Sequence, residues 1–218
     1  MLIGASLLSL PLFSAHKVMD SLHSGGIDYW HIDVMDGNFV PNFAFNPMWL
    51  KMIQKEYPSI PFDVHFMTTH TALMNVSPVF ASMSPTWFSI HVESEPNADQ
   101  WIRFCQKQSI KAGLAISPET SISTLEPYLS ALDFVLVMSV KPGFGGQSFL
   151  QDTFNRIETL QNLRVRQSAS FFIQVDGGIQ EKEAIQLKKM NVDMIVIGSY
   201  LVHHANPSDV LRQIVESS

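Results

Sequence analysis

Short apolar runs recur along the chain, and each is followed by a longer stretch in which apolar residues return every three or four positions. Near-continuous apolar runs are typical of parallel strands that are buried on both faces, and the longer stretches are typical of amphipathic helices. The expected strands are Ile3–Ser6, Tyr29–Val34, Phe62–Phe66, Trp87–His91, Lys111–Ile116, Phe134–Met138, Phe171–Val175 and Met194–Gly198. The clearest expected helices are Ala44–Lys55, Ala98–Gln108, Phe154–Arg166, Lys182–Met190 and Pro207–Val215.

This alternation predicts a parallel sheet covered by helices, in a single domain over residues 1–218. An open doubly wound sheet and a closed barrel both fit the alternation. An open sheet would place a glycine-rich turn after its first strand, and the segment from Gly4 to Leu10 offers none. Eight strand-and-helix units favour closure, so we expect an α/β protein with the (β/α)₈ TIM-barrel fold.

Composition narrows the class of protein. The chain has 14 Lys and Arg against 20 Asp and Glu, and no segment gathers the basic residues into a patch, which argues against a nucleic-acid partner. No apolar run approaches the length of a membrane span. The single cysteine, Cys105, excludes an internal disulfide and favours a cytoplasmic setting.

The first 15 residues are apolar enough to resemble a signal peptide. They lack the positively charged leading region of such peptides, because the first lysine is Lys17. We therefore expect this segment to form a buried first strand and the start of a helix.

Polar side chains alternate with apolar ones at the ends of two expected strands. His31 and Asp33 share one strand face, and Asp63 and His65 share a face of the next strand. A further carboxylate, Asp176, stands at the end of a late strand. Carboxyl ends of barrel strands are where barrel enzymes place their chemistry, and buried imidazoles and carboxylates need partners. We expect His31, Asp33, His65 and Asp176 to bind a divalent cation such as Zn, Fe, Mn or Co.

Glycine-rich turns follow three neighbouring late strands. They contain Gly143, Gly145, Gly146 and Gln147, then Gly177 and Gly178, and finally Gly198 with Ser199. Each glycine alone could merely ease a tight turn. Together they predict a phosphate site, because exposed backbone N–H groups cradle anions and barrels commonly bind phosphate after their last strands.

Three methionines, Met35, Met67 and Met138, fall at or just past strand ends. Methionine usually fills gaps in a core. The alternative is an apolar collar that keeps water away from the reacting carbon, and the pattern leaves both interpretations open.

These features together resemble the ribulose-phosphate 3-epimerase family. The motifs that carry the resemblance are HIDVMDGNFVPN (His31–Asn42), DVHFM (Asp63–Met67), MSVKPGFGGQSF (Met138–Phe149), VDGGI (Val175–Ile179) and VIGSYL (Val196–Leu201). They occur in the family's order from about residue 3 to the end of the chain.

The resemblance implies inversion at C3 of a ketose phosphate, D-ribulose 5-phosphate to D-xylulose 5-phosphate. It implies that Asp33 and Asp176 transfer the proton through an enediolate and also bind the metal with His31 and His65. The same resemblance places Ser6 near the substrate oxygens, assigns phosphate contacts to Gly146, Gly178, Gly198 and Ser199, and makes a homo-oligomer the expected assembly.

Alternative functions stay open at this level. Asn38 and Ser117 depart from the family pattern, and relatives act on six-carbon substrates such as D-allulose 6-phosphate. Phosphate-binding decarboxylases related to orotidine-monophosphate decarboxylase need an Asp-x-Lys-x-x-Asp run, whereas this chain reads Asp33-Val34-Met35-Asp36 without the lysine. A barrel that only binds sugar phosphate is disfavoured because both aspartates are present.

Overall fold

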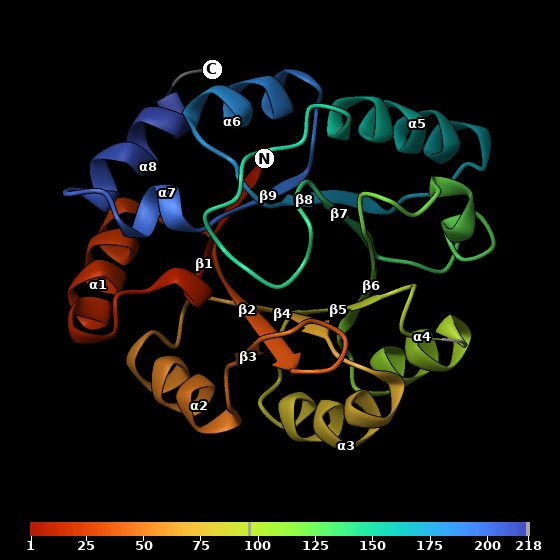
Figure 1. Cartoon of the computed structure of the whole chain (residues 1–218), viewed down its shortest axis with the longest axis horizontal. Helices are drawn as coiled ribbons and strands as arrows, with labels where there is room; N and C mark the ends of the chain where they lie inside the picture. Colours follow the sequence, from red (N-terminus) through yellow and green to blue (C-terminus); the bar gives the residue numbers. More distant parts are fainter. Residues whose placement is uncertain (96, 217–218) are drawn as a thin grey trace.

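The computed structural model describes residues 1–95 and 97–216, which form a closed barrel of eight parallel strands ringed by helices (Figure 1). The barrel strands are β1 (Leu2–Ser6), β2 (Tyr29–Asp36), β4 (Phe62–Met67), β5 (Trp87–His91), β6 (Lys111–Ile116), β7 (Phe134–Met138), β8 (Phe172–Asp176) and β9 (Met194–Ile197). Strand β1 pairs in parallel with both β2 and β9, and this double pairing closes the barrel. The predicted TIM-barrel fold is confirmed, and the first apolar segment forms β1 as expected.

The helical layer follows the predicted order, with bounds that differ by a few residues. Its helices are α1 (Ala15–Gly25), α2 (Pro47–Glu56), α3 (His70–Ala81), α4 (Ala98–Lys107), α5 (Thr153–Arg166), α6 (Glu181–Lys189), α7 (Ser199–Val202) and α8 (Pro207–Glu216). Short 3₁₀ turns, η1 (Leu7–Ser9) and η2 (Leu12–Ser14), connect β1 to α1. Within the described residues, no helix is both long and apolar enough to cross a membrane.

The start of α2 corrects the helix predicted to begin at Ala44. Strand β2 runs two residues further than expected, and its end pairs with a short antiparallel strand, β3 (Phe43–Ala44). The helix begins only at Pro47, where the Asn46 side chain accepts hydrogen bonds from the backbone N–H groups of Met48 and Trp49. A capping side chain followed by proline sets a helix start more strongly than apolar periodicity does.

The crossover from β6 to β7 carries a 3₁₀ turn, η3 (Ile122–Leu125), in place of the α-helix that a complete unit would have. The Arg156 guanidinium of α5 compensates by donating hydrogen bonds to the carbonyls of Ser117, Pro118 and Thr120. Together with Glu93, which accepts a hydrogen bond from the Ser117 backbone N–H, this side chain holds a segment that has little regular structure of its own.

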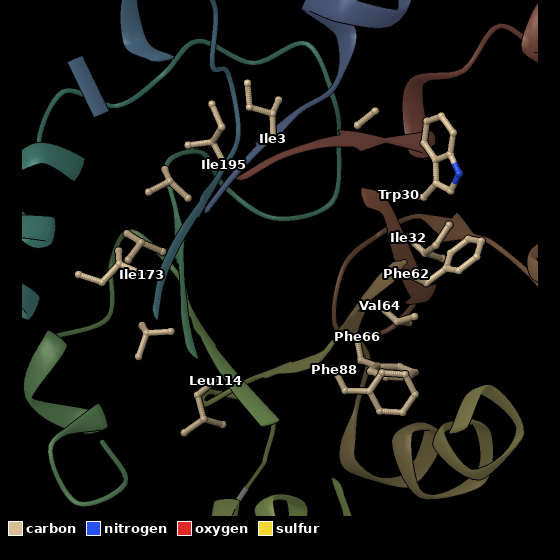
Figure 2. Packing of buried hydrophobic residues seen from close by; sticks show 14 of the residues in the cluster. Ile3, Trp30, Ile32, Phe62, Val64, Phe66, Phe88, Leu114, Ile173 and Ile195 are labelled. Carbon is tan, nitrogen blue, oxygen red and sulfur yellow. The ribbon is translucent and has the colours of Figure 1, made fainter. Parts of the chain in front are cut away.

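The outer faces of the strands form the main hydrophobic core against the helices. Figure 2 shows Ile32, Val64, Phe66 and Phe88 pointing away from the barrel axis, and all four are fully buried. Alternation along each strand sends the intervening residues into the barrel. The interior therefore receives the polar residues of β2 and β4, and these side chains are almost fully buried.

Candidate active site

Four side chains meet inside the barrel near the carboxyl ends of its strands. His31 and Asp33 come from β2, His65 from β4 and Asp176 from β8, and each offers a ligand atom within 4.8 Å of the others. His31 Nε2 lies 3.3 Å from Asp33 Oδ1 and 3.7 Å from Asp176 Oδ2. His65 Nδ1 lies 3.3 Å from the same Asp33 oxygen. The predicted cluster is therefore assembled in the fold.

Strand pairing explains why these residues meet. Asp33 is opposite His65 in the β2–β4 register. Two residues earlier on each strand, His31 is opposite Asp63. Parallel strands in register bring residues at equal depth side by side on the same face. The cluster spans β2, β4 and β8, with β1 and β9 completing the wall between β2 and β8.

The cluster fits a divalent cation. His65 is fully buried, yet neither of its ring nitrogens has a hydrogen-bond partner among the described residues. A buried polar atom without a partner costs stability, and a cation would satisfy it. Two imidazoles and two carboxylates are a donor set for Zn, Fe, Mn or Co, whereas calcium prefers oxygen ligands alone.

The two histidines differ in their tendency to carry charge. Burial opposes a charge on His31, but the Asp33 and Asp63 carboxylates outweigh burial and raise the pKa of its imidazole well above the ordinary value. Burial lowers the pKa of His65 to about 4, against a smaller opposing effect of Asp33. His65 is thus neutral near pH 7, which is the form that binds a metal.

The two aspartates are also unequal. Burial opposes a charge on Asp33, yet His31 and His65 outweigh it and lower the pKa of this carboxyl below the ordinary range. Burial raises the pKa of Asp176, and the neighbouring carboxylates of Asp33 and Asp63 add to the rise while His31 opposes it. The Asp176 side chain is 14% exposed and the Asp33 side chain 4%. Two carboxyl groups with pKa values shifted in opposite directions suit one acid and one base.

Ser6, at the end of β1, contacts the cluster directly. Its hydroxyl donates to Asp33 Oδ2 at 3.1 Å and accepts a hydrogen bond from the Leu8 backbone at 3.3 Å. The backbone bond fixes the hydroxyl orientation, so Ser6 holds Asp33 on the side opposite its contact with His31.

A single cavity opens above the cluster and brings the other predicted substrate residues together. Asp33 and Asp176 form its floor, while His31 and His65 lie buried beneath. The predicted residues that line it are Ser6, Met35, Met67, Met138, Gly143, Gly145, Gly146, Gln147, Gly177, Gly178, Gly198 and Ser199. Leu8, Ser9, Val140, Lys141, Pro142 and Phe144 also line it, and the sequence analysis did not single them out.

Two glycines in the wall have a definite conformational reason. Gly178 has φ +63°, and a Cβ there would lie 2.6 Å from the Gln147 carbonyl oxygen, which is closer than van der Waals contact allows. Gly146 has φ +75° and open space where a Cβ would be, so its backbone is accessible from the cavity. Gly178 therefore permits close packing of two loops, and Gly146 leaves peptide groups available to an anion.

The loop after β7 crosses the mouth of the barrel (Figure 1), and hydrogen bonds from side-chain amides hold it in place. Asn42 Nδ2 donates to the Gly143 carbonyl at 2.8 Å, and Gln147 Nε2 donates to the carbonyls of Lys141 and Phe144. Gln147 was predicted as a substrate contact. It lines the cavity, and these bonds show that its amide group also shapes the loop.

The three methionines are buried around the cavity. Met35 and Met67 pack with Val40, whereas Met138 packs with Phe134, Leu136 and Val140 on the opposite side. The methionines thus fill the core, as methionine usually does, and also form part of the cavity wall; a role in keeping water from a reacting carbon stays a prediction.

Ser139 is a further residue that the sequence analysis did not single out. Its hydroxyl lies 2.8 Å from the Asp176 carbonyl oxygen and 2.6 Å from that of Gly177, and it ties the end of β7 to the strand that carries Asp176. A serine next to a predicted methionine gave no signal of its own, since the contact depends on β7–β8 pairing.

Solved structures with the same fold include enzymes that handle six-carbon phosphates. The 3-hexulose-6-phosphate synthase from Salmonella typhimurium matches with a TM-score of 0.77, covering 100% of this chain and 98% of that one, at 15% identity. The 3-keto-L-gulonate-6-phosphate decarboxylase from Vibrio cholerae matches with a TM-score of 0.75 over 99% and 96%, at 12% identity. At these identities the likeness concerns the fold alone.

Sequence relatives give a narrower result. The ribulose-phosphate 3-epimerase of Aquifex aeolicus is 33% identical over 198 residues, which cover 91% of this chain and 88% of the relative. That of Helicobacter pylori strain 26695 is 32% identical over 201 residues, covering 92% and 90%. The model of the ribulose-phosphate 3-epimerase family matches residues 2–202. Because the family model covers most of the chain and these relatives are more than 30% identical to it, the chain belongs to the ribulose-phosphate 3-epimerase family of isomerases.

Proposed function

We propose that the protein is a metal-dependent 3-epimerase that interconverts D-ribulose 5-phosphate and D-xylulose 5-phosphate. The observation that carries the proposal is the convergence of two carboxylates and two imidazoles within 4.8 Å, beneath a cavity walled by glycine turns. Epimerisation next to a carbonyl needs a proton acceptor, a proton donor and a positive charge near the carbonyl oxygen, and family membership points to the same reaction.

His31, Asp33, His65 and Asp176 would hold the cation. When bound, it supplies the positive charge that stabilises the enediolate, an effect typically worth several kcal/mol. The donor set suits Zn, Fe, Mn or Co, and the orphaned nitrogens of His65 support its role as a neutral ligand.

Asp33 and Asp176 would move the proton. One carboxylate removes the proton from C3, and the electron pair of the C–H bond becomes the C2–C3 double bond as the carbonyl oxygen gains negative charge. The other carboxyl group then returns a proton to C3 from the opposite face, and the carbonyl re-forms. Two groups are required because a single base would return the proton to its own side; each positioned acid or base contributes a factor of about 10²–10⁴.

The glycine turns would bind the phosphate group. The Gly146 backbone is open to the cavity, and the turns at Gly177–Gly178 and Gly198–Ser199 line the same wall. Met35, Met67 and Met138 would cover the reacting carbon and exclude water, which strengthens the electrostatic interactions inside the site. Ser6, at hydrogen-bond distance from Asp33, would contact a substrate oxygen.

The test is an assay of metal-stripped and metal-reconstituted enzyme in parallel, on D-ribulose 5-phosphate and on D-allulose 6-phosphate. We expect metal-dependent formation of xylulose 5-phosphate, faster than conversion of the hexulose. In D₂O, the product should carry deuterium at C3, because the donor group exchanges with solvent. Metal-dependent turnover of the hexulose alone would move the function to six-carbon substrates. Binding without turnover or deuterium incorporation would make the chain a sugar-phosphate binder.

The proposal extends to assembly and setting. A homo-oligomer is supported by large apolar side chains that are exposed on η2, β3 and α2, namely Leu12, Phe13, Phe43, Met48 and Met52. Light scattering coupled to size-exclusion chromatography should give a mass above that of one chain, and a monomer mass would contradict it.

The free, buried thiol of Cys105 supports a reducing, cytoplasmic setting.

A further inference from the structure

A second polar layer lies directly below the metal cluster. Tyr29, Asp63 and Gln174 are fully buried inside the barrel, on the strands that carry the metal ligands. Each precedes a ligand by two positions, because Tyr29 precedes His31, Asp63 precedes His65 and Gln174 precedes Asp176. Residues two apart on a strand share a face, so on each strand the layer residue lies one level below a ligand, and Asp63 is level with His31 in the β2–β4 register.

Hydrogen bonds link this layer into a chain that ends on a metal ligand. Tyr29 Oη donates to the Ile195 carbonyl at 2.8 Å, and Gln174 Nε2 donates to Tyr29 Oη at 3.1 Å. The same Gln174 nitrogen donates to Asp63 Oδ2 at 2.6 Å, and His31 Nδ1 donates to that oxygen at 2.7 Å. The chain therefore runs from the backbone of β9 through β2, β8 and β4 to the imidazole of His31.

The direction of the donors fixes the state of His31. Because the Tyr29 hydroxyl is used on a carbonyl, the Gln174 amide must present its N–H groups, and not its oxygen, to both neighbours. A carboxylate oxygen accepts and does not donate, so His31 Nδ1 carries a proton toward Asp63. Nε2 is then the nitrogen that faces the cluster, 3.3 Å from Asp33 and 3.7 Å from Asp176, where a cation would take the place of its proton.

The other histidine ligand has no such support. Neither His65 nitrogen is hydrogen-bonded within the described part of the chain, and Ser89, opposite it on β5, also has an unpartnered hydroxyl there. The site thus contains one histidine whose outer nitrogen is hydrogen-bonded to a carboxylate, and one whose closest polar contact is Asp33 inside the cluster itself.

Burying Asp63 is costly in the folded chain. Its Oδ1 atom and the Oε1 atom of Gln174 have no hydrogen-bond partner among the residues described. A half-satisfied buried polar network destabilises a fold relative to an apolar core of the same shape. Such a network indicates a role other than stability.

We propose that Asp63, held by Gln174 and Tyr29, is a positioning residue that fixes the His31 ring and its Nδ1–H tautomer so that Nε2 faces the cation. A carboxylate on the outer nitrogen of a metal-binding histidine orients the ring and increases its basicity toward the metal. The inference rests on the metal site proposed above, and it predicts an effect on cation affinity that a purely structural role would not produce.

The experiment measures the dissociation constant of Co²⁺ by competition with a chromophoric chelator, for wild type and variants, without substrate. Asp63→Asn should weaken Co²⁺ binding about 10- to 100-fold, since losses of this size follow removal of a partner behind a metal ligand. The Co²⁺ absorption bands should stay near their wild-type positions, because all four ligands remain. Ser89→Ala is the matched control: it changes a buried polar residue of the barrel interior outside the chain of hydrogen bonds, and should leave the affinity unchanged.

Two further variants separate positioning from folding. Gln174→Met removes the bond to Asp63 at similar side-chain volume, and Tyr29→Phe removes only the last hydroxyl. Affinity should fall in the order Asp63→Asn, Gln174→Met, Tyr29→Phe, and if Asp63→Asn fails to fold, a loss in Gln174→Met decides the question. Reduced thermal stability with wild-type Co²⁺ affinity throughout would overturn the inference and leave the proposed function standing. Wild-type protein that binds no Co²⁺ would overturn the metal site itself.

Discussion

The two faces of strands β2 and β4 serve different ends although their residues alternate along the same backbone. Outward, Ile32, Val64 and Phe66 are fully buried against helices in the main hydrophobic core. Inward, His31 and His65 are just as buried but are surrounded by carboxylates and orphaned polar atoms. The two faces are equally buried but contribute oppositely to the free energy of unfolding. Burial of apolar side chains on the outer face stabilises the barrel, whereas burial of polar groups on the inner face lowers its stability.

The largest effect is expected when the inner face of the barrel is altered at Asp176, on β8. Asp176→Asn keeps the size and removes the carboxylate, so kcat should fall by a factor of about 10²–10⁴ or more. The free energy of unfolding should change little, and binding of inorganic phosphate should persist. The measurement is kcat at saturating metal with bound metal quantified, and turnover near the wild-type rate would show that the two-aspartate mechanism is wrong.

The converse change removes an outer-face side chain. Phe66 makes edge contacts with Phe80, Phe88 and Trp101, and Phe66→Ala should lower the free energy of unfolding by about 3–5 kcal/mol. At a temperature where the variant remains folded, kcat should stay close to wild type. Denaturant unfolding and steady-state kinetics check the two halves, and a large drop in kcat without loss of stability would contradict the division of roles.

A smaller effect is expected in the wall of the cavity at Gly178. A Cβ there meets the backbone of Gln147 and Phe149, so Gly178→Ala should displace the loop after β7 and raise KM about tenfold, equivalent to about 1.4 kcal/mol. Gly26→Ala is the matched control. Gly26 also has positive φ, +88°, but has open space and ends α1 away from the site. The control should lose about 1–2 kcal/mol of stability with KM unchanged, and equal KM changes in both would refute the steric explanation.

The smallest effect is expected at Ile32, which lies between the two proposed ligands of β2, His31 and Asp33. Ile32→Val removes one outward methylene group and should cost about 0.5–1.5 kcal/mol of unfolding free energy. Activity and Co²⁺ affinity should be unchanged, because the backbone of the strand is kept. Should Co²⁺ affinity fall several-fold, the two faces of the strand would be coupled through its backbone position.

Much of the difference between the inner and outer strand faces can be predicted from the local sequence. Alternation places His31, Asp33 and His65 on inner faces, and strand order places Asp176 near them, so the cluster is predictable from spacing and fold class alone. The short strand β3 was missed, because a two-residue pairing leaves no periodicity, and the start of α2 was misplaced with it. The partners of Asp63 were not predictable either, since Gln174 lies 111 residues away and meets Asp63 only through barrel closure.

The crossover between β6 and β7 has a consequence for how this barrel can change. Arg156 donates to the carbonyls of Ser117, Pro118 and Thr120, and Glu93 accepts from the Ser117 backbone N–H, where other units rely on a full helix. Amide hydrogens there should exchange faster than those of the helical units, since little regular hydrogen bonding protects them. This crossover is therefore a natural point for grafting an additional segment, because extra residues would interrupt no α-helix and would leave intact the strands that carry the four-residue cluster.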